Sequence, residues 1–363
     1  MVWFMKKILC ILSSLSAGGA ETFIMKLCRA VSAEELQMDF IVSVAGGCYT
    51  EEVLDRGGRI YQIPQRTQNF FGAFGGIRRI VKENGYTAVL KLGENALAVT
   101  DLIAARLGGA KTLALRSCNA PTGVSLGGRC IHGMLRPLLN AMATVKLAPS
   151  DLAAEYMFGK AKDVHLLHNG VDLNVFRYEA DGRQAIRREF AVEDKLVVGH
   201  VGRLHKQKNH RYLLEVFKAI QKQRRDAVLL LVGIGELENT IREWVRELDL
   251  EDSVIFAGQR FDIPQLLSAM DVFVFPSLHE GMPNTVIEAQ ATGLPCVIAD
   301  TITKEADITG LVTYLPLTEN KTPWVDTALA AAMQKRRDTA ADFAAQGYDI
   351  KVVAQELMEL LGG

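Results

Sequence analysis

The sequence predicts an α/β protein built of two Rossmann-like, parallel-sheet domains, and three observations lead to this prediction. Short apolar runs alternate with helix-length segments along almost the whole chain. The alternation stops over the polar, charged stretch Arg177–Glu193 and then restarts. With 363 residues, 49% of them hydrophobic, the chain is long enough for two separate cores. Near-continuous apolar strands joined by helices are typical of a parallel sheet covered on both faces.

The expected elements follow the chain in order. The strands expected in the first half are KILCILSS (7–14), MDFIVSV (38–44), RIYQIP (59–64), AVLKL (88–92), TLALR (112–116), ATVKLAPS (143–150) and VHLLHN (164–169). Those of the second half are LVVGHVGR (196–203), AVLLLVG (227–233), SVIFAG (253–258), VFVFPS (272–277), PCVIA (295–299) and LVTYLP (311–316). Helices are expected between them, for example over Glu21–Glu34, Phe74–Asn84 and Leu126–Ala141.

These elements predict four segments. Residues 1–176 form an N-terminal Rossmann-like domain, and 177–194 form a linker region. Residues 195–340 form a C-terminal Rossmann-like domain. Residues 341–363 form a C-terminal helix, expected to pack back on the N-terminal domain.

Composition excludes several classes of protein. Lys and Arg number 41 against 42 Asp and Glu, which argues against a nucleic-acid-binding surface. The six cysteines form no CxxC pair, so reduced thiols in a cytoplasmic protein are expected rather than a disulfide framework or a zinc site. The apolar run Ile8–Leu12 imitates a signal peptide but is cut short by serines, which favours a buried strand. No apolar run approaches the ~20 residues of a transmembrane helix.

The first candidate motif is SSLSAGGAETF, which follows the first strand. Gly18 and Gly19 at a helix start would let the backbone approach a ligand, and the helix N-terminus offers N–H groups to an anion. A tight strand-to-helix turn explains the glycines equally well. The motif is no dinucleotide fingerprint, because the third glycine is missing.

A basic loop follows the first strand of the second domain, in GHVGRLHKQKN. Arg203 and Lys208 stand after Gly202 and before a helix expected to begin near Asn209. Two cations beside a helix N-terminus suit a diphosphate. The alternative is that both are ordinary surface charges.

Two glutamates mark the stretch SLHEGMPNTVIEAQATGLPCVIA. Glu280 lies in a loop, and Glu288 lies one turn into a helix expected to begin near Asn284. An ionised carboxylate accepts two hydroxyl donors at once, so Glu280 suits a sugar and Glu288 a ribose diol. A solvated helix face would explain the carboxylates, but not Gly281, Pro283, Gly293 and Pro295 around them.

The runs PSLHEGMPNTVIEAQATGLPCV, GRLHKQKN, LLHNGVDLNVF and GGAE together resemble the family-4 retaining glycosyltransferases. The likeness extends over most of the chain and is strongest to the bacterial exopolysaccharide and capsule branch. It implies the GT-B fold, an α/β architecture in which two doubly wound, Rossmann-like parallel-sheet domains face each other across a cleft.

The resemblance also implies a role for each motif. Gly19 would approach the donor phosphate or sugar, Arg203 and Lys208 would hold the diphosphate, and Glu280 and Glu288 would hold the donor sugar and the ribose. Arg203, Lys208 and Glu280 are therefore the expected catalytic residues. The remaining expected donor contacts are Gly18, Gly202, the base-pocket segment Phe256–Arg260 with Gly258 and Gln259, and the loop residues Gly281, Met282, Pro283, Asn284 and Thr285.

The sequence departs from the family pattern after its fifth strand. Where many members have H-S-H-N, this chain has LALRSCNAP, so Arg116 and Cys118 occupy the candidate positions and Asn119 matches. Arg116 and Asn119 are expected on the acceptor side in place of the family histidine. His279 is also unusual beside Glu280, where an aromatic or small residue is more common.

The segment SLGGRCIHGMLRPLLNAM combines Arg129, His132 and Arg136 with apolar residues at helical spacing. One hypothesis is an acceptor-side basic helix that meets a lipid-linked diphosphate at the inner face of the membrane. The alternative is an amphipathic helix with a solvated face.

The expected function is therefore metal-independent transfer of a hexose or N-acetylhexosamine, with retention, from a nucleotide sugar that is most simply UDP-linked. No cofactor or metal is expected, since neither a D-x-D motif nor a set of histidines at ligand spacing is present. The acceptor would be a glycan or a lipid-linked saccharide in cell-surface polysaccharide synthesis. Two alternatives stay open, a nucleotide-sugar 2-epimerase and a non-catalytic nucleotide-sugar-binding protein.

Overall fold

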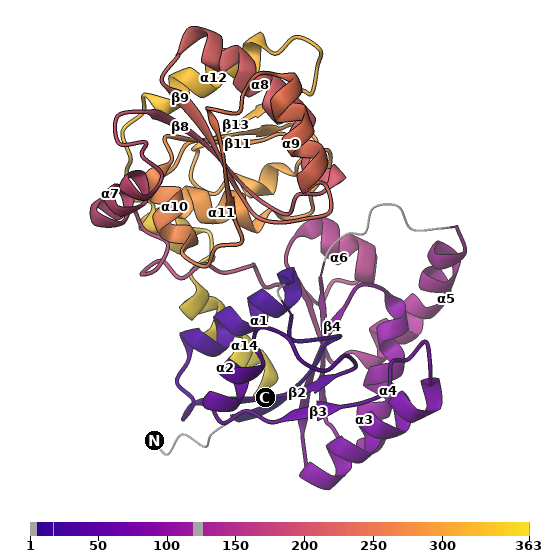
Figure 1. Ribbon diagram of the computed structural model, residues 1–363. Coiled ribbons are helices and arrows are strands. Elements are labelled where there is room, and N and C mark those ends of the chain that lie inside the picture. Colours follow the sequence, from indigo (N-terminus) through magenta and orange to yellow (C-terminus); the bar gives the residue numbers. More distant parts are fainter. Residues whose placement is uncertain (1–5, 17, 119–125, 363) are drawn as a thin grey trace. The chain divides into compact units, whose positions relative to one another are not determined.

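The computed structural model describes residues 6–16, 18–118 and 126–362 and divides the chain into two compact units (Figure 1). Unit 1 comprises the residues up to Asp172 together with Gly347–Gly363, and unit 2 comprises Leu173–Gln346. Each unit contains a parallel sheet with helices on both faces, which confirms the fold class expected from the sequence.

Unit 1 has a seven-stranded sheet in the order β3-β2-β1-β4-β5-β6-β7, and each strand was expected from the sequence. The strands are β1 (Lys6–Ile11), β2 (Leu36–Val42), β3 (Ile60–Gln62), β4 (Ala88–Gly93), β5 (Thr112–Ser117), β6 (Val145–Ala148) and β7 (Val164–Leu166). The helices are α1 (Gly19–Ala30), α2 (Thr50–Asp55), α3 (Phe70–Asn84), η1 (Ala96–Ala98), α4 (Val99–Gly108), α5 (Leu126–Met142), α6 (Asp151–Phe158) and α14 (Ile350–Leu361).

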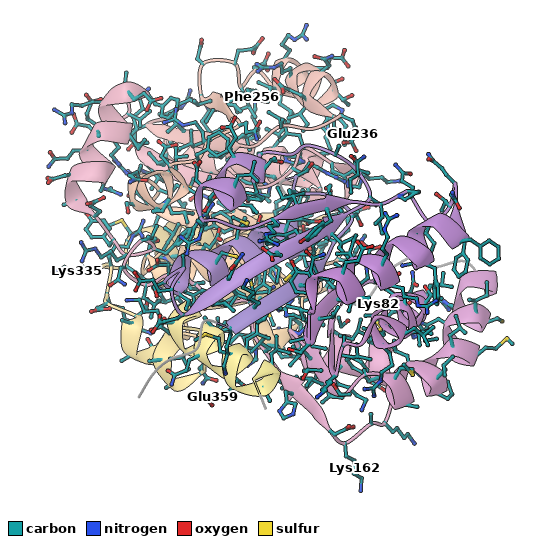
Figure 2. The ribbon with its side chains drawn as sticks, turned by 90° about the horizontal axis from the view of Figure 1, so that it is seen from below. Lys82, Lys162, Glu236, Phe256, Lys335 and Glu359 are labelled. Carbon is teal, nitrogen blue, oxygen red and sulfur yellow. The ribbon has the colours of Figure 1, made fainter. Side chains whose placement is uncertain are left out.

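Helix α3 begins four residues before its expected start. The side chain of Asn69 caps the helix, because its Oδ1 accepts a hydrogen bond from the N–H of Gly72 at 2.8 Å. Such a cap satisfies one of the unpaired N–H groups of the first turn. Charged residues such as Lys162 and Glu359 project outward from unit 1 (Figure 2).

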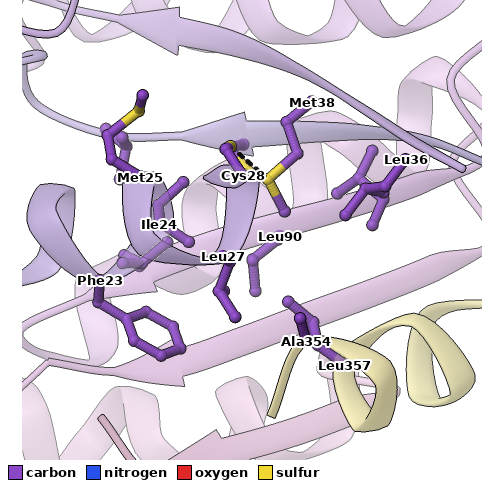
Figure 3. Close-up of a cluster of buried hydrophobic side chains, with 14 of the residues drawn as sticks. Phe23, Ile24, Met25, Leu27, Cys28, Leu36, Met38, Leu90, Ala354 and Leu357 are labelled. Atoms are coloured by element: carbon purple, nitrogen blue, oxygen red, sulfur yellow. Dashed lines mark hydrogen bonds between the residues drawn. The ribbon is translucent and has the colours of Figure 1, made fainter. Parts of the chain in front are cut away.

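The side chains of β1 supply both cores of unit 1, because successive residues of a strand point to opposite faces. Ile8 and Cys10 pack with α1 and α14, whereas Leu9 and Ile11 pack with α3 and α4. The C-terminal helix α14 buries Ala354 and Leu357 against the α1 side of the sheet (Figure 3). The side chain of Asp349 caps the N-terminus of α14, because its Oδ1 accepts a hydrogen bond from the N–H of Lys351 at 2.9 Å.

Unit 2 has a six-stranded sheet in the order β10-β9-β8-β11-β12-β13, again from strands expected in the sequence. The strands are β8 (Leu196–Val201), β9 (Ala227–Val232), β10 (Val254–Gly258), β11 (Val272–Phe275), β12 (Cys296–Ala299) and β13 (Val312–Leu315). The helices are α7 (Ala180–Glu189), η2 (Lys206–Lys208), α8 (His210–Gln223), α9 (Glu238–Glu247), α10 (Ile263–Ala269), α11 (Asn284–Ala291), η3 (Lys304–Ala306), α12 (Thr322–Ala332) and α13 (Ala340–Ala345).

Helix α7 lies in the segment expected as a linker and belongs to unit 2. Arg183 and Arg187 donate hydrogen bonds to the last carbonyls of α10, and each also pairs with Asp271 at 2.7 Å. Cations at a helix C-terminus are favourable because they meet unpaired carbonyls and the negative end of the helix dipole. The segment is polar in sequence because its arginines form hydrogen bonds with the C-terminal carbonyls of α10.

Candidate active site

The candidate residues of unit 2 lie at the carboxyl edge of its sheet, where the strand order reverses between β8 and β11. The loop after β8 carries Arg203 and Lys208, and the loop after β11 carries Glu280. Ligands of open parallel sheets bind at such reversals.

An ion pair joins these two loops. Lys208 Nζ lies 2.6 Å from Glu280 Oε1, with side chains only 16% and 11% exposed. Ser277 Oγ donates to the same carboxylate oxygen at 2.8 Å, and the Lys208 ammonium lies 4.6 Å above the ring centroid of Phe275. The lysine and the glutamate are thus held in fixed places by buried neighbours.

Backbone hydrogen bonds strengthen the same junction. The N–H of Leu278 donates to the carbonyl of Gln207 at 2.8 Å, and Gln207 Nε2 donates to the carbonyl of His279 at 2.8 Å. His279 therefore contributes its backbone to the junction. These contacts hold η2 and the loop before α11 as one block.

Close backbone approach explains the glycine that follows β9. Gly233 follows β9 with φ +134°, in the region that favours glycine, and a Cβ there would collide with the carbonyl oxygen of Gly202. The N–H of Gly202 donates to Val232 at 2.9 Å, which keeps the start of the basic loop against β9.

Arg203 lies on the loop after β8, and Glu288 lies on helix α11, which begins after the loop that follows β11. Arg203 is exposed on the loop that leads to η2. Helix α11 begins at Asn284 after Pro283, with no side-chain cap among the described residues, and Glu288 lies one turn into it at 9% exposure. The structure thus gathers Arg203, Lys208, Glu280 and the start of α11 around the β8–β11 reversal.

The expected base segment lies at the end of β10. This strand ends at Gly258, whose φ of +68° turns the chain away from the sheet, and Gln259 beyond it is exposed. Arg260 forms ion pairs with Glu189 at 2.5 Å and Asp262 at 2.6 Å, which keep the pKa of its guanidinium raised.

Two buried histidines lie beneath the basic loop. His200 and His210 are 0% and 2% exposed, with ring centroids 5.0 Å apart, and His200 stacks on Phe275 at 5.3 Å. Burial, and to a lesser extent the charge of Lys208, lowers the pKa of His210 to about 4. Burial and then His210 lower the pKa of His200 well below its ordinary value. Both rings are therefore neutral at pH 7.

The N-terminal motif lies at the carboxyl edge of the unit 1 sheet. Gly18 is the N-cap of α1 and Gly19 its first residue. A Cβ on Gly18 would collide with the carboxylate of Glu21, which folds back over the helix start. The glycine-rich turn is confirmed, whereas a ligand contact by Gly19 stays a prediction.

Arg116 has a different position from the one expected. Its side chain is 1% exposed and stacks on Phe23 at 3.7 Å, and its Nη2 donates to the carbonyl of Leu167 at 3.0 Å and to Asn169 Oδ1 at 2.6 Å. Burial lowers its pKa to about 10, so the guanidinium stays charged at neutral pH. The expectation that Arg116 contacts an acceptor therefore gives way to a structural role, tying β5 to the loop after β7.

Of the two other candidate residues after β5, the structure describes Cys118 but not Asn119. Cys118 is half-buried and lines a cavity of unit 1, and burial raises its pKa to about 11, so its thiol is neutral. Asn119 lies outside the described residues.

The basic helix expected on the acceptor side is α5. Arg129 is exposed on it, but His132 is 7% exposed and stacked on Tyr156. His132 Nδ1 accepts from the N–H of Ala96 at 3.1 Å, so Nε2 donates to the carbonyl of Tyr156 at 2.9 Å. His132 is therefore buried inside unit 1 and is not part of an exposed basic surface.

Comparison with known proteins decides the family. The family model described as "Glycosyl transferases group 1" matches residues 195–335. The putative glycosyltransferase EpsF of Bacillus subtilis is 36% identical, over 95% of this chain and 93% of its own. The chain belongs to the group 1 glycosyltransferases. An Escherichia coli UDP-Gal:alpha-D-GlcNAc-diphosphoundecaprenol alpha-1,3-galactosyltransferase is 38% identical over 38% of this chain and 36% of its own.

Solved structures confirm the GT-B fold of this glycosyltransferase. Anabaena HepE, solved in complex with UDP, has a TM-score of 0.80 at 19% identity, covering 98% of this chain and all of its own. Three residues of the candidate site were not predicted, namely Ser277, Gln207 and Phe275. Ser277 stands three residues before Glu280 in the sequence, so its position could have predicted a contact with Glu280.

The buried histidines predict a loss of stability in acid. An unfolded histidine has a pKa of about 6.5, and in the folded state both values lie lower, so the unfolded chain binds more protons between these limits. The free energy of unfolding thus has its full value well above pH 6.5, and it decreases as the pH falls below 6.5. For His210 alone the loss between pH 6.5 and 5.5 is about 1 kcal/mol.

Chemical denaturation at these two pH values measures this loss. His210→Phe removes one of the two groups and should reduce the pH dependence by roughly half. An unchanged dependence in this variant would contradict the assignment.

Proposed function

We propose that this glycosyltransferase transfers a hexose or N-acetylhexosamine from a UDP-sugar, with retention of the anomeric configuration and without a metal, to a glycan or lipid-linked saccharide in cell-surface polysaccharide synthesis. The observation that carries the proposal is the Lys208–Glu280 pair beside the start of α11. The UDP-bound HepE structure and the UDP-Gal substrate named for the E. coli relative support a UDP-linked donor. Family membership favours transfer over the epimerase and binding-protein alternatives.

The chemistry requires cations where the leaving group forms. Breaking the anomeric C–O bond builds negative charge on the departing diphosphate, and an enzyme gains rate by stabilising that charge more strongly in the transition state. Arg203, Lys208 and the first turn of α11 would supply fixed positive charge there. These cations are the proposed counter-charge. Among the described residues no three His, Cys, Asp or Glu side chains gather at metal-binding distance.

Glu280 is proposed to orient the donor sugar rather than to attack it. Its Oε1 already accepts from Lys208 and Ser277, which reduces its nucleophilicity. We therefore propose front-face retention, in which the leaving phosphate helps to deprotonate the acceptor hydroxyl.

Peripheral membrane contact is proposed for α5. None of its residues is acidic, and Ile131, Met134 and Leu138 are 48%, 80% and 45% exposed along one face. Arg129 and Arg136 lie on the same helix. Exposed apolar side chains on a helix that carries cations and no acidic residue fit an anionic lipid surface, where a lipid-linked acceptor would be found. In the described part of the chain, no helix is long and apolar enough to span a membrane.

The enzymatic proposal predicts products and their stereochemistry. With an α-linked UDP-sugar and an acceptor, NMR should detect UDP and an α-linked product, and EDTA should leave the rate unchanged. Glu280→Gln should lower kcat by roughly a hundredfold, about 3 kcal/mol, because it loses a preorganised contact. The exposed Glu319→Gln is the matched control and should retain activity.

Two results would contradict this proposal. A C2-epimerised nucleotide sugar formed without acceptor would indicate the isomerase alternative. Equal rates for wild type and Glu280→Gln would remove Glu280 from the site.

The membrane proposal predicts binding to anionic vesicles. Wild-type protein should co-sediment with phosphatidylglycerol vesicles more than with neutral phosphatidylcholine vesicles, and less at high salt. Met134→Glu should weaken binding by roughly tenfold, because it replaces an apolar contact with a repelled charge. Met333→Glu alters a methionine of unit 2 that is 75% exposed and should bind like wild type. Equal binding by both variants would exclude α5 as the contact.

A further inference from the structure

A cavity of about 420 Å³ lies in unit 1. Much of its lining comes from the segments that follow β1 to β5, including Ser13, Ser43, Glu94 and Cys118. It therefore opens at the carboxyl edge of the sheet, where the strand order reverses between β1 and β4. This is the position at which an open parallel sheet binds ligands.

A buried aspartate holds two cations against this cavity. Asp101 on α4 is 6% exposed in its side chain, and its Oδ2 lies 2.5 Å from Arg66 Nη2 and 3.1 Å from Lys91 Nζ. Arg66 also donates through Nη1 to the carbonyl of Leu97 at 3.2 Å. Lys91, on β4, is only 12% exposed and lines the cavity together with Arg66.

The charges of this cluster do not cancel. Among the described residues, Asp101 is the one carboxylate within ion-pair distance of either cation, so the cluster has a net charge of +1. A nearly buried ammonium without a full counter-charge is costly, and an anion in the cavity would offset this cost.

The cavity also has an acidic side. Glu21 and Glu94 line it, and burial, followed by the nearby charge of Glu94, raises the pKa of Glu21. Carboxylates accept hydrogen bonds from sugar hydroxyls. The cavity thus offers cations to an anionic group and carboxylates to hydroxyl groups.

We infer that this cavity binds a saccharide carrying an anionic group, a carboxylate or a phosphate, which Lys91 and Arg66 hold at the cluster fixed by Asp101. Glu21 and Glu94 accept hydrogen bonds from its hydroxyl groups. That this saccharide is the acceptor rests on the proposed function, whereas its anionic group is inferred from the cluster of Asp101, Arg66 and Lys91. The anion has two possible sources, an acidic sugar ring or a phosphate at the reducing end of a lipid-linked saccharide.

Matched saccharide pairs test the inference. Dissociation constants are measured by ligand-observed NMR for glucuronate against glucose, and for N-acetylglucosamine 1-phosphate against N-acetylglucosamine, with UDP present to occupy the donor residues. At least one charged probe should bind about tenfold or more tightly than its neutral partner, and the pair with the greater gain identifies the source of the anion. Lys91→Met should abolish the preference, and Lys82→Met, on the exposed side of α3 (Figure 2), should keep it.

Three outcomes would overturn the inference: no binding of either charged probe, equal binding within both pairs, or a preference that survives in Lys91→Met. If Lys91 served only to tie β4 to α4, its substitution would lower the melting temperature and weaken the binding of charged and neutral saccharides to the same extent. Titration of UDP into the same proteins without saccharide tests unit 2 separately. Failure of UDP binding would count against the donor assignment and leave the unit 1 result intact.

Discussion

The structure of the candidate donor site depends on the ion pair between Lys208 and Glu280. Both side chains are nearly buried, so each requires the other to offset the loss of water. Their contact joins the loops after β8 and β11, and Ser277 and Gln207 add hydrogen bonds that fix the same junction. The carboxylate proposed to bind the donor sugar and the ammonium proposed to bind the diphosphate are thereby preorganised side by side.

Neutral surroundings beneath the pair preserve its charge balance. His200 and His210 are buried and uncharged at neutral pH, so they add no positive charge under Lys208. The ring centroid of Phe275 lies 4.6 Å from the ammonium, and His200 stacks on Phe275 with a centroid distance of 5.3 Å. The side-chain charges proposed to meet the diphosphate are those of Lys208 and the exposed Arg203.

The fold could be predicted from sequence because parallel-sheet strands are nearly continuous apolar runs, and each expected run is a strand. The Gly- and Pro-bearing loop around Glu280 likewise marked the carboxyl edge of β11. Side-chain direction could not be predicted in this way. Arg116 and His132 stand beside loops and charged residues in sequence, yet both are buried and bonded to backbone carbonyls.

The contacts that sequence could not reveal join distant segments. Asp101, Arg66 and Lys91 lie on three different elements, and no local pattern indicates that they meet. The arginines of α7 appeared to belong to a linker because their partners are carbonyls of α10, which carry no sequence signal.

Calorimetric titration of UDP tests the central claim most directly, with Lys206→Met as the exposed control on the same short helix. The account predicts that Lys208→Met weakens UDP by at least tenfold and Lys206→Met by less than about twofold, since a charge-assisted phosphate contact contributes about 1.5–3 kcal/mol. Wild-type affinity in Lys208→Met, or equal weakening in both variants, would contradict it.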